Sequence, residues 1–167
     1  MDVYVYLTGT PDSLPDIATP CSSVSVSLND AAESYGSFTV PADETYSLIA
    51  DIAARPNGEI VIELDGSEIY RANFDSISYS IGNSSANASL RASHTFTNST
   101  PATVVIDSPI VAKGINSLGE RYYQIGEYFP IVAGDTVTID GDSWTCRNVQ
   151  FSFSPTSFSQ RITELLP

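Results

Sequence analysis

The residues best suited to chemistry are few in this sequence, and they lie far apart. His94 is the only histidine, and it stands between Ser93 and Thr95 with no cysteine close by in the chain. Zinc sites and catalytic histidines need further ligands or proton-transfer partners within reach. The sequence therefore favours a partly buried strand position for His94, with a satisfied hydrogen bond, over a metal or catalytic role.

Nucleophilic and redox chemistry are weakly indicated as well. No serine lies in the Gly-x-Ser-x-Gly turn that presents the nucleophile of many hydrolases. Cys21 and Cys146 are the only cysteines, and their spacing matches neither a Cys-x-x-Cys pair nor a disulfide framework. The sequence leaves open whether these two thiols pair. We therefore expect no enzymatic activity, no cofactor and no bound metal.

Two groups of carboxylates could form sites, but simpler explanations are available. The first group is Glu59, Glu63 and Glu68, and the second is Asp135, Asp140 and Asp142. A pair of acids can hydrolyse a sugar, yet alternation along a strand places Glu59 and Glu63 on one solvated face without a positioned partner. The second group lacks the bidentate glutamate and the ordered ligands of a calcium loop, so we expect it to stabilise turns.

The composition indicates a strand-rich chain. The 167 residues include 24 Ser, 14 Thr, 9 Tyr and 7 Phe, but one Lys and one Met. Threonine and aromatic residues suit a pleated sheet surface, whereas serine is a poor helix-interior residue. Charged residues make up only 16% of the chain, a low fraction for the surface of an isolated monomer. The composition therefore also favours a component of an assembly.

Alternating patterns and turn residues predict that most of the chain forms short strands. The expected strands cover residues 3–8, 22–28, 37–40, 59–64, 67–74, 75–81, 88–96, 102–107, 121–125, 136–139, 144–153 and 158–165. Apolar residues recur at helical spacing only between Asp43 and Arg55, so we expect one short helix there. We predict an all-β, mainly antiparallel fold, a split β-barrel or sandwich-like barrel, formed by residues 1–167 as a single domain with an extended loop near 108–120.

Two Asp-Gly dipeptides give the strongest local signals. Asp65-Gly66 separates an apolar run from the next strand, and Asp140-Gly141 separates residues 136–139 from 144–153. Both dipeptides favour the two-residue hairpin turn that needs positive φ angles. We therefore predict two tight hairpins at these positions.

Two longer sequence segments resemble those of a known family of proteins. The first runs from Gly58 to Ser80, a strand, Asp-Gly and strand hairpin ending in Asp-Ser-Ile-Ser, and is followed by Ser89-Leu90-Arg91. The second is the Gly-Asp-Thr-Val strand and turn of residues 133–144, with two further strands after it. These segments resemble parts of the baseplate hub and distal tail proteins of bacteriophage tails. The resemblance implies a split β-barrel subunit that forms a ring and joins the tail tube to the adsorption apparatus.

The charge excludes some partners, and the resemblance suggests others. With 20 acidic and 7 basic residues, the formal charge is −13, which disfavours nucleic acid and anionic membranes as partners. The resemblance implies copies of the same chain and other tail proteins (tube, hub and fibre proteins) as partners. It also implies a place in the tail of the virion, after assembly in the host bacterial cytoplasm. The alternative is a carbohydrate-binding or adhesin-like β-sandwich with exposed aromatic residues.

One aromatic cluster is the candidate interface. It comprises Arg121, Tyr122, Tyr123, Tyr128 and Phe129. Tyrosine, phenylalanine and arginine are enriched at the cores of protein interfaces. We expect Arg121 to meet an acidic group of a neighbouring subunit there, because copies that each carry −13 repel one another wherever negative charge is not offset.

Overall fold

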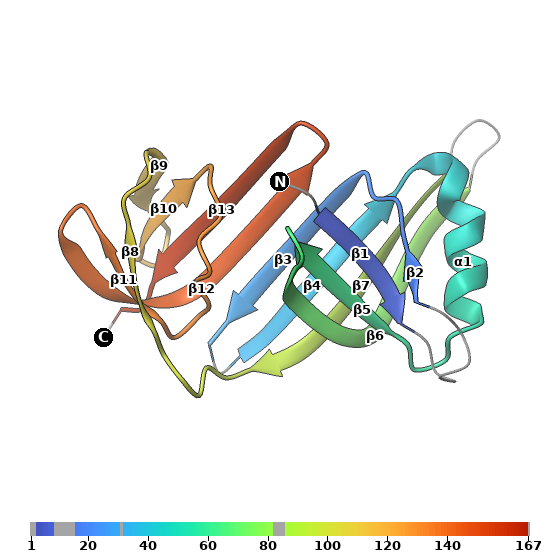
Figure 1. Ribbon diagram of the computed structural model, residues 1–167, viewed down its shortest axis with the longest axis horizontal. Helices are drawn as coiled ribbons and strands as arrows, with labels where there is room; N and C mark the ends of the chain where they lie inside the picture. The colour runs from blue at the N-terminus through green and yellow to red at the C-terminus, as the bar shows by residue number, and fades with distance from the viewer. Residues whose placement is uncertain (1–2, 9–15, 31, 82–85, 167) are drawn as a thin grey trace. The chain divides into compact units, whose positions relative to one another are not determined.

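A computed structural model of the chain describes residues 3–8, 16–30, 32–81 and 86–166. The chain, expected to form one domain over residues 1–167, divides by its internal contacts into two compact units. Unit 1 comprises residues 1–25 and 35–94, and unit 2 comprises residues 26–34 and 95–167. Unit 1 consists of strands and one short α-helix, and unit 2 consists of strands (Figure 1). The predicted all-β class is therefore confirmed.

Unit 1 is an antiparallel sheet with a helix at one end of its strands (Figure 1). Its hydrogen-bonded strand order is β2-β1-β5-β6-β7-β4. The strands are β1 (Val3–Thr8), β2 (Ile17–Ala18), β4 (Ala32–Val40), β5 (Glu59–Leu64), β6 (Ser67–Ile81) and β7 (Ala86–Phe96). A 3-10 turn, η1 (Ala42–Glu44), leads into α1 (Thr45–Ala53), which lies where the sequence predicted a helix.

The core of unit 1 includes the apolar run before Asp65, in which Val61 is buried as well as its neighbours. Ile60, Ile62 and Leu64 of β5 are all buried on one side of the sheet. Tyr70 of β6 is buried too, and its hydroxyl donates a 2.8 Å hydrogen bond to the carbonyl of Ala92. Burial of these apolar groups is the main stabilising contribution in such a sheet.

Unit 2 contains two hydrogen-bonded layers that share one strand. The first has the order β3-β12-β13-β10-β9, and the second joins β12 to β11 and β11 to β8. The strands are β3 (Ser23–Asn29), β8 (Thr103–Ile106), β9 (Ile110–Ile115), β10 (Arg121–Ile125), β11 (Thr136–Ile139), β12 (Asp142–Ser154) and β13 (Ser157–Glu164). Unit 2 buries Trp144, Phe151 and Ile162, among other residues. The strand β8 pairs in parallel with β11, whereas β12 pairs antiparallel with β13.

Both predicted Asp-Gly hairpins are present. Asp65 and Gly66 have φ angles of 47° and 81°, and Asp140 and Gly141 have φ angles of 53° and 85°. Two consecutive positive φ angles define the turn whose twist matches antiparallel strands. These turns connect β5 to β6 and β11 to β12.

Three details differ from the sequence-based description. The predicted strands 67–74 and 75–81 form one continuous strand, β6, with a register shift between Phe74 and Ser76. The loop expected near residues 108–120 contains a regular strand, β9, followed by a turn. In the described residues the strand order of neither unit returns on itself, so neither sheet closes into a barrel. Residues 82–85, which lie between the expected strands 75–81 and 88–96, are outside the described residues.

Candidate interaction surfaces

The side chains that could take part in catalysis or metal binding occupy ordinary structural positions. His94 is half-buried on β7, and its ring lies 5.2 Å from the ring of Tyr70. Cys21 and Cys146 are both free thiols, and burial raises the pKa of each to about 12. In the part of the chain that the structure describes, no cluster of three or more His, Cys, Asp or Glu side chains could hold a metal ion. No helix there is long and apolar enough to span a bilayer.

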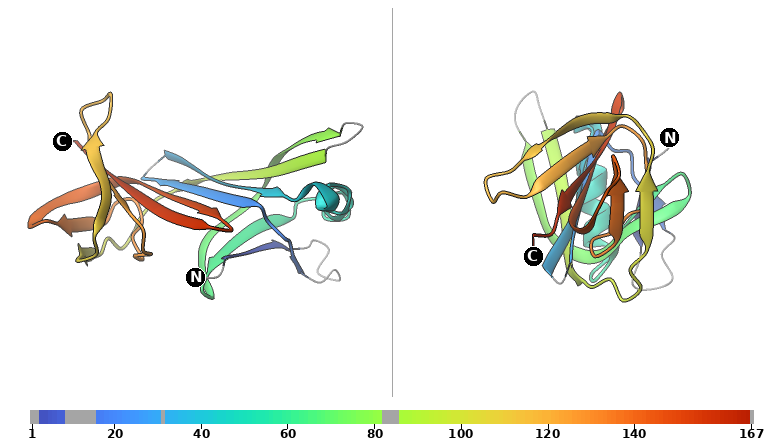
Figure 2. Two further views of the ribbon diagram at one scale, coloured as in Figure 1. Left: turned by 90° about the horizontal axis from the view of Figure 1, so that it is seen from above. Right: turned by 90° about the vertical axis from the view of Figure 1, so that its left-hand side faces the viewer.

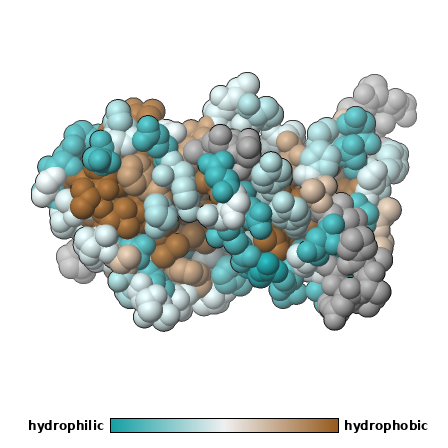
Figure 3. Space-filling model, viewed as in Figure 1, coloured by the Kyte–Doolittle hydropathy of each residue, from teal (hydrophilic) through white to brown (hydrophobic). Residues whose placement is uncertain are grey.

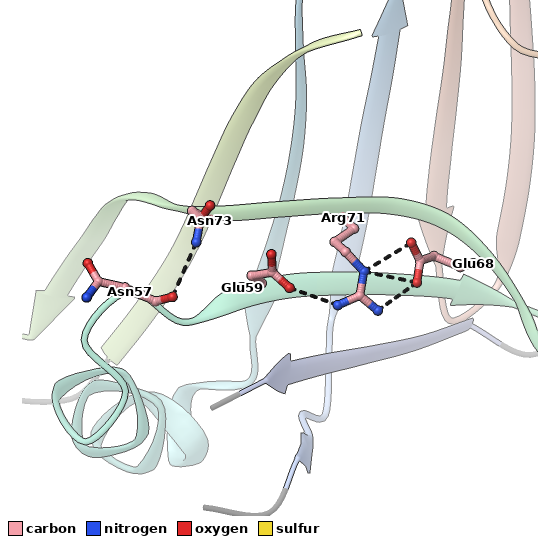
Figure 4. Close-up of polar contacts among 5 residues, drawn as sticks. All are labelled: Asn57, Glu59, Glu68, Arg71 and Asn73. Atoms are coloured by element: carbon pink, nitrogen blue, oxygen red, sulfur yellow. Dashed lines mark hydrogen bonds and ion pairs between the residues drawn. The ribbon is translucent and has the colours of Figure 1, made fainter. Parts of the chain in front are cut away.

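Two of the three carboxylates in the first group, Glu59 and Glu68, are drawn together by an arginine (Figure 4). Arg71 on β6 lies between Glu59 and Glu68, with its guanidinium nitrogens 2.8 Å from a carboxylate oxygen of each. The hydrogen bonds to Glu68 and then Glu59 raise the pKa of Arg71 above its usual value. Since both acids are engaged by one cation, they do not form the pair of separated carboxyl groups that sugar hydrolysis requires.

A pair of tyrosines lies on the same face of unit 1. Strand register places Tyr6 opposite Val61, which is opposite Arg71, so the side chains of these residues share one side of the sheet. Tyr4 is 45% exposed, and its ring stacks on that of Tyr6 with centroids 6.2 Å apart. This tyrosine face therefore combines exposed aromatic surface with the ion cluster of Figure 4.

The second carboxylate group does not form one site. Asp135 is buried, and its carboxylate accepts hydrogen bonds from the Asn98 side chain and the Ala102 amide at 2.8 Å, and from the Val132 amide at 2.9 Å. It therefore fastens residues 98–102 to the turn before β11. Asp140 instead faces Lys113 at 3.3 Å. The turn-stabilising explanation is therefore the one that fits Asp135.

Arg121, the charged member of the candidate interface, is engaged within its own chain. Its guanidinium binds both oxygens of Glu164 at 2.8 Å and approaches Asp142 at 3.1 Å. The hydrogen bond from Arg121 lowers the pKa of Glu164 below its usual range. Nearby, Glu120 is buried and pairs with Arg147, and a hydrogen bond from Asn116 contributes most to its lowered pKa.

The aromatic members of the candidate interface differ in exposure. Tyr123 is buried and its ring stacks on Trp144 with centroids 5.7 Å apart. Tyr122 is half-buried beneath the guanidinium of Arg161, which lies 3.9 Å from the ring centroid. The neighbouring loop holds the other two aromatic residues of the set.

Tyr128 and Phe129 are half-buried in that loop, and the ring of Tyr128 tilts against Phe151. Gln160, a buried residue that the sequence did not single out, fixes the backbone of Phe129: its side-chain oxygen accepts from the Phe129 amide and its nitrogen donates to the Phe129 carbonyl. The loop is thus held in one position, with Tyr128 and Phe129 in part accessible to a partner.

The strand β9 exposes apolar side chains at the edge of unit 2. Val111 and Ile115 of β9 are 66% and 69% exposed, and Leu118 in the following turn is 64% exposed. In the described residues β9 pairs only with β10, so its other edge has unpaired backbone groups. Figure 2 shows the end of the β9-β10 hairpin projecting from the other strands of unit 2. We name the surface formed by Val111, Ile115 and Leu118 the β9 apolar edge.

Strand β8 is a second edge with an apolar side chain exposed. Val105 is 63% exposed, and β8 pairs only with β11 in the part of the chain that is described. Figure 3 shows an apolar surface area at the left of the view, in the region that β8 occupies in Figure 1. Exposed apolar edge strands are prone to pair with other chains, and natural proteins usually cover or charge them.

Every basic residue of the chain has a partner within the chain. Four of the seven bind carboxylates as described above, namely Arg71, Lys113, Arg121 and Arg147. Arg55 lies 3.7 Å from Asp51, and Arg91 and Arg161 cover the rings of Tyr35 and Tyr122. The cations of the chain are thus engaged by its own carboxylates and aromatic rings.

The comparisons with known proteins rest on the fold alone. No protein-family model matches the sequence, and no curated protein matches it with significance. Among solved structures, the 43 kDa tail protein of prophage MuSo2 from Shewanella oneidensis is similar, with a TM-score of 0.67 at 6% identity, over 98% of this chain and 97% of that chain. A tail protein from Neisseria meningitidis MC58 is similar with a TM-score of 0.64 at 7% identity, over 98% and 96%.

A third similar structure comes from Escherichia coli. It is a component of the type VI secretion system that is described as similar to two tail proteins of bacteriophage T4. Its TM-score is 0.59 at 6% identity, and the match covers 98% of this chain and 76% of that chain. The chain thus has the fold found in phage tail proteins, as the resemblance of its two sequence segments implied.

Proposed function

We propose that this protein is a structural component of a bacteriophage tail. In this proposal it forms a ring, as a baseplate hub or distal tail protein, that connects the tail tube to the adsorption apparatus. Its partners are copies of itself and other tail proteins, and its location is the tail of the virion. We further propose that residues 1–167 act together as one domain of the tail type.

The observation that carries the proposal is the fold match over nearly the whole chain. The similar tail proteins from Shewanella oneidensis and Neisseria meningitidis each align with 98% of this chain. Fold alone does not determine function, so the surfaces matter as well. Exposed apolar strand edges are what a subunit of an assembly would have.

We also propose that Tyr122, Tyr128 and Phe129 contribute to contacts with neighbouring subunits, because they are aromatic and half-exposed. Arg121 and Tyr123 are proposed to support that surface from beneath. The bidentate pair with Glu164 and the stacking on Trp144 hold these two side chains in place. Their substitution would therefore weaken the fold together with any contact.

The proposal is tested by the mass and the location of the protein. Size-exclusion chromatography with light scattering should give a mass several times the 17.9 kDa of one chain. Electron microscopy of phage particles with a labelled antibody should place the label at the tail tip. A monomer at all concentrations would contradict the ring, and label found away from the tail would contradict the location.

The tyrosine face favours one alternative function. Exposed Tyr4 beside Tyr6, with carboxylate and guanidinium groups on the same face, offers stacking and hydrogen bonding to a sugar. A carbohydrate-binding module would bind oligosaccharides as a monomer. Glycan-array binding that is lost in Tyr4→Ala, together with a monomeric mass, would support this alternative over the tail ring.

A further inference from the structure

The exposed apolar side chains are distributed unequally along the chain. Eight large hydrophobic residues are exposed among the described residues, and six of them belong to unit 2. They are Val105, Val111, Ile115, Leu118, Leu165 and Leu166. Three of the six form the β9 apolar edge, which lies beside unpaired backbone groups of an edge strand. This edge therefore offers both apolar contact and backbone hydrogen bonds to another chain.

The segment of residues 103–119, which contains the β9 apolar edge, is also unusual in its charge. Residues 103–119 contain one acidic and one basic side chain, Asp107 and Lys113. The other 150 residues contain 19 acidic and 6 basic side chains, so they carry the whole net charge of −13. The β8-β9 segment is thus an electrically neutral part of a strongly acidic chain.

The charged groups next to the β9 apolar edge are paired within the chain, two cations with three carboxylates. Strand register places Ile115 opposite Arg121, which is paired with Glu164 and Asp142. Lys113, between Val111 and Ile115, is paired with Asp140. An apolar centre with paired charges at its border has the anatomy of a protein interface.

We infer that the β9 apolar edge is the contact surface for a second copy of this chain, which adds a strand to β9. This inference rests on the proposed ring and names the surface that forms it. Two copies that each carry −13 repel at most orientations. The neutral β9 apolar edge is a surface on which that repulsion is smallest and the apolar gain on contact is large. A cationic partner would instead bind the acidic surfaces, and the β9 apolar edge has no net charge to attract it.

The first experiment compares two matched variants by light scattering over a range of concentrations. Ile115→Asp places a charge in the β9 apolar edge, and Tyr46→Asp places the same charge at a similarly exposed residue of α1, away from any strand edge. We expect Ile115→Asp to raise the dissociation constant of the oligomer by about tenfold or more. Tyr46→Asp should change it far less, apart from a small effect of the added charge.

The outcomes separate this inference from the proposed function. An oligomer that dissociates equally in wild type and Ile115→Asp would overturn the inference but leave the ring proposal standing. Equal weakening by the two variants would also overturn it, because the contact would then not be specific to β9. A wild-type monomer at every concentration would contradict the ring proposal itself, and the inference with it.

A second measurement needs no variant, so it guards against misfolding of Ile115→Asp. Hydrogen exchange of the wild-type chain is followed at concentrations above and below the dissociation constant. We expect amides of residues 110–115 to become protected in the oligomer, since an added strand would pair with the free edge of β9. Unchanged exchange in β9, with protection gained elsewhere, would show that the copies meet at a different surface.

Discussion

Gly66 illustrates how a single residue is required by the backbone rather than by packing. Its φ angle is +81°, and a Cβ atom added there would meet no other atom within 4 Å. A side chain at this position is therefore strained only through its backbone conformation. We expect Gly66→Ala to lower the free energy of unfolding by about 1–2 kcal/mol.

The control for this prediction is Gly126→Ala. Gly126 does not have a positive φ angle, and an added Cβ would make only ordinary contact with Val111 at 3.6 Å. Alanine there should leave stability unchanged or raise it by about 0.4–1 kcal/mol. Urea unfolding measures both variants, and an equal effect of the two would rule out φ strain at Gly66. Gly114 is not a suitable control, because an added Cβ would lie 2.8 Å from the Tyr122 hydroxyl.

The buried carboxylate of Glu164 should make the free energy of unfolding depend on pH. Its pKa is lowered in the folded chain, mainly by the hydrogen bond from Arg121. A lowered folded-state pKa stabilises the fold fully above the unfolded value, near 4.5, and the contribution is lost as the pH falls through the folded value. We expect Glu164→Gln to be less stable than wild type at neutral pH, and the difference to shrink as the pH falls below about 4.5.

Urea unfolding at a series of pH values tests the role of Glu164. Glu127→Gln is the matched control, because Glu127 is exposed, and it should differ little from wild type at any pH. A Glu164→Gln deficit that stays constant from pH 7 to pH 3 would contradict the role given to the ionised pair. Glu120, whose pKa is also lowered, should add to the loss of wild-type stability in acid.

At the scale of elements, local signals were readable from the sequence and distant pairings were not. The turns at Gly66 and Gly141 were predicted because two adjacent residues determine a hairpin turn. The helix before residue 55 was predicted from its apolar spacing. The apolar run before Asp65 predicted β5 in the same way, since each of these signals lies within about ten residues of chain.

The candidate surfaces depend on partners that are far apart in sequence. Arg121 and Glu164 are 43 residues apart, and Gln160 lies 31 residues from the Phe129 backbone that it holds. No local pattern predicts that Arg121 would be neutralised in its own chain, so its exposure to a neighbour was expected instead. The exposed edge of β9 was also hidden, because an edge is defined by strand order rather than by the sequence of one strand.

Asp135 joins two elements of unit 2, and its removal gives a prediction at this scale. Its carboxylate accepts from the Ala102 and Val132 amides and from Asn98. Asp135→Ala would leave these part-buried donors without their acceptor, which costs about 1–3 kcal/mol for each donor that water cannot reach. We expect a loss of roughly 2–4 kcal/mol in the free energy of unfolding, on the basis of the same principle.

Two further variants test the explanation for Asp135. Asp135→Asn keeps one acceptor oxygen and should lose less stability than Asp135→Ala. Asp107→Ala removes an exposed acid near the same elements and should have little effect. If Asp135→Ala unfolds at the same urea concentration as wild type, the carboxylate does not fasten residues 98–102 to the β11 turn.

At the scale of the whole molecule, the net charge opposes the assembly of copies, whereas one segment without net charge favours it. The chain carries −13 overall, whereas the segment from residue 103 to residue 119 has no net charge. Each basic residue is already engaged inside the chain, so few cations remain to offset the acids of a neighbouring copy. Assembly of such subunits is therefore driven by apolar contact and backbone pairing, and it is opposed by long-range repulsion.

This opposition predicts that salt strengthens assembly. Raising the salt concentration from about 0.01 M to about 1 M shortens the Debye length from roughly 30 Å to roughly 3 Å, which screens the repulsion between copies. We expect the dissociation constant, measured by light scattering, to fall as sodium chloride is added. Ion pairs across the interface would instead be weakened by salt, so a rising dissociation constant would mean that charged contacts hold the copies together.

A charge-reduced variant distinguishes screening from a general effect of salt on apolar contact. The four exposed acids Asp16, Asp43, Asp107 and Glu127 can be changed to their amides together, which reduces the formal charge from −13 to −9. Because less repulsion remains to be screened, we expect this variant to assemble more tightly at low salt and to respond less to added salt. An identical salt dependence in both proteins would show that the net charge of the chain does not limit its assembly.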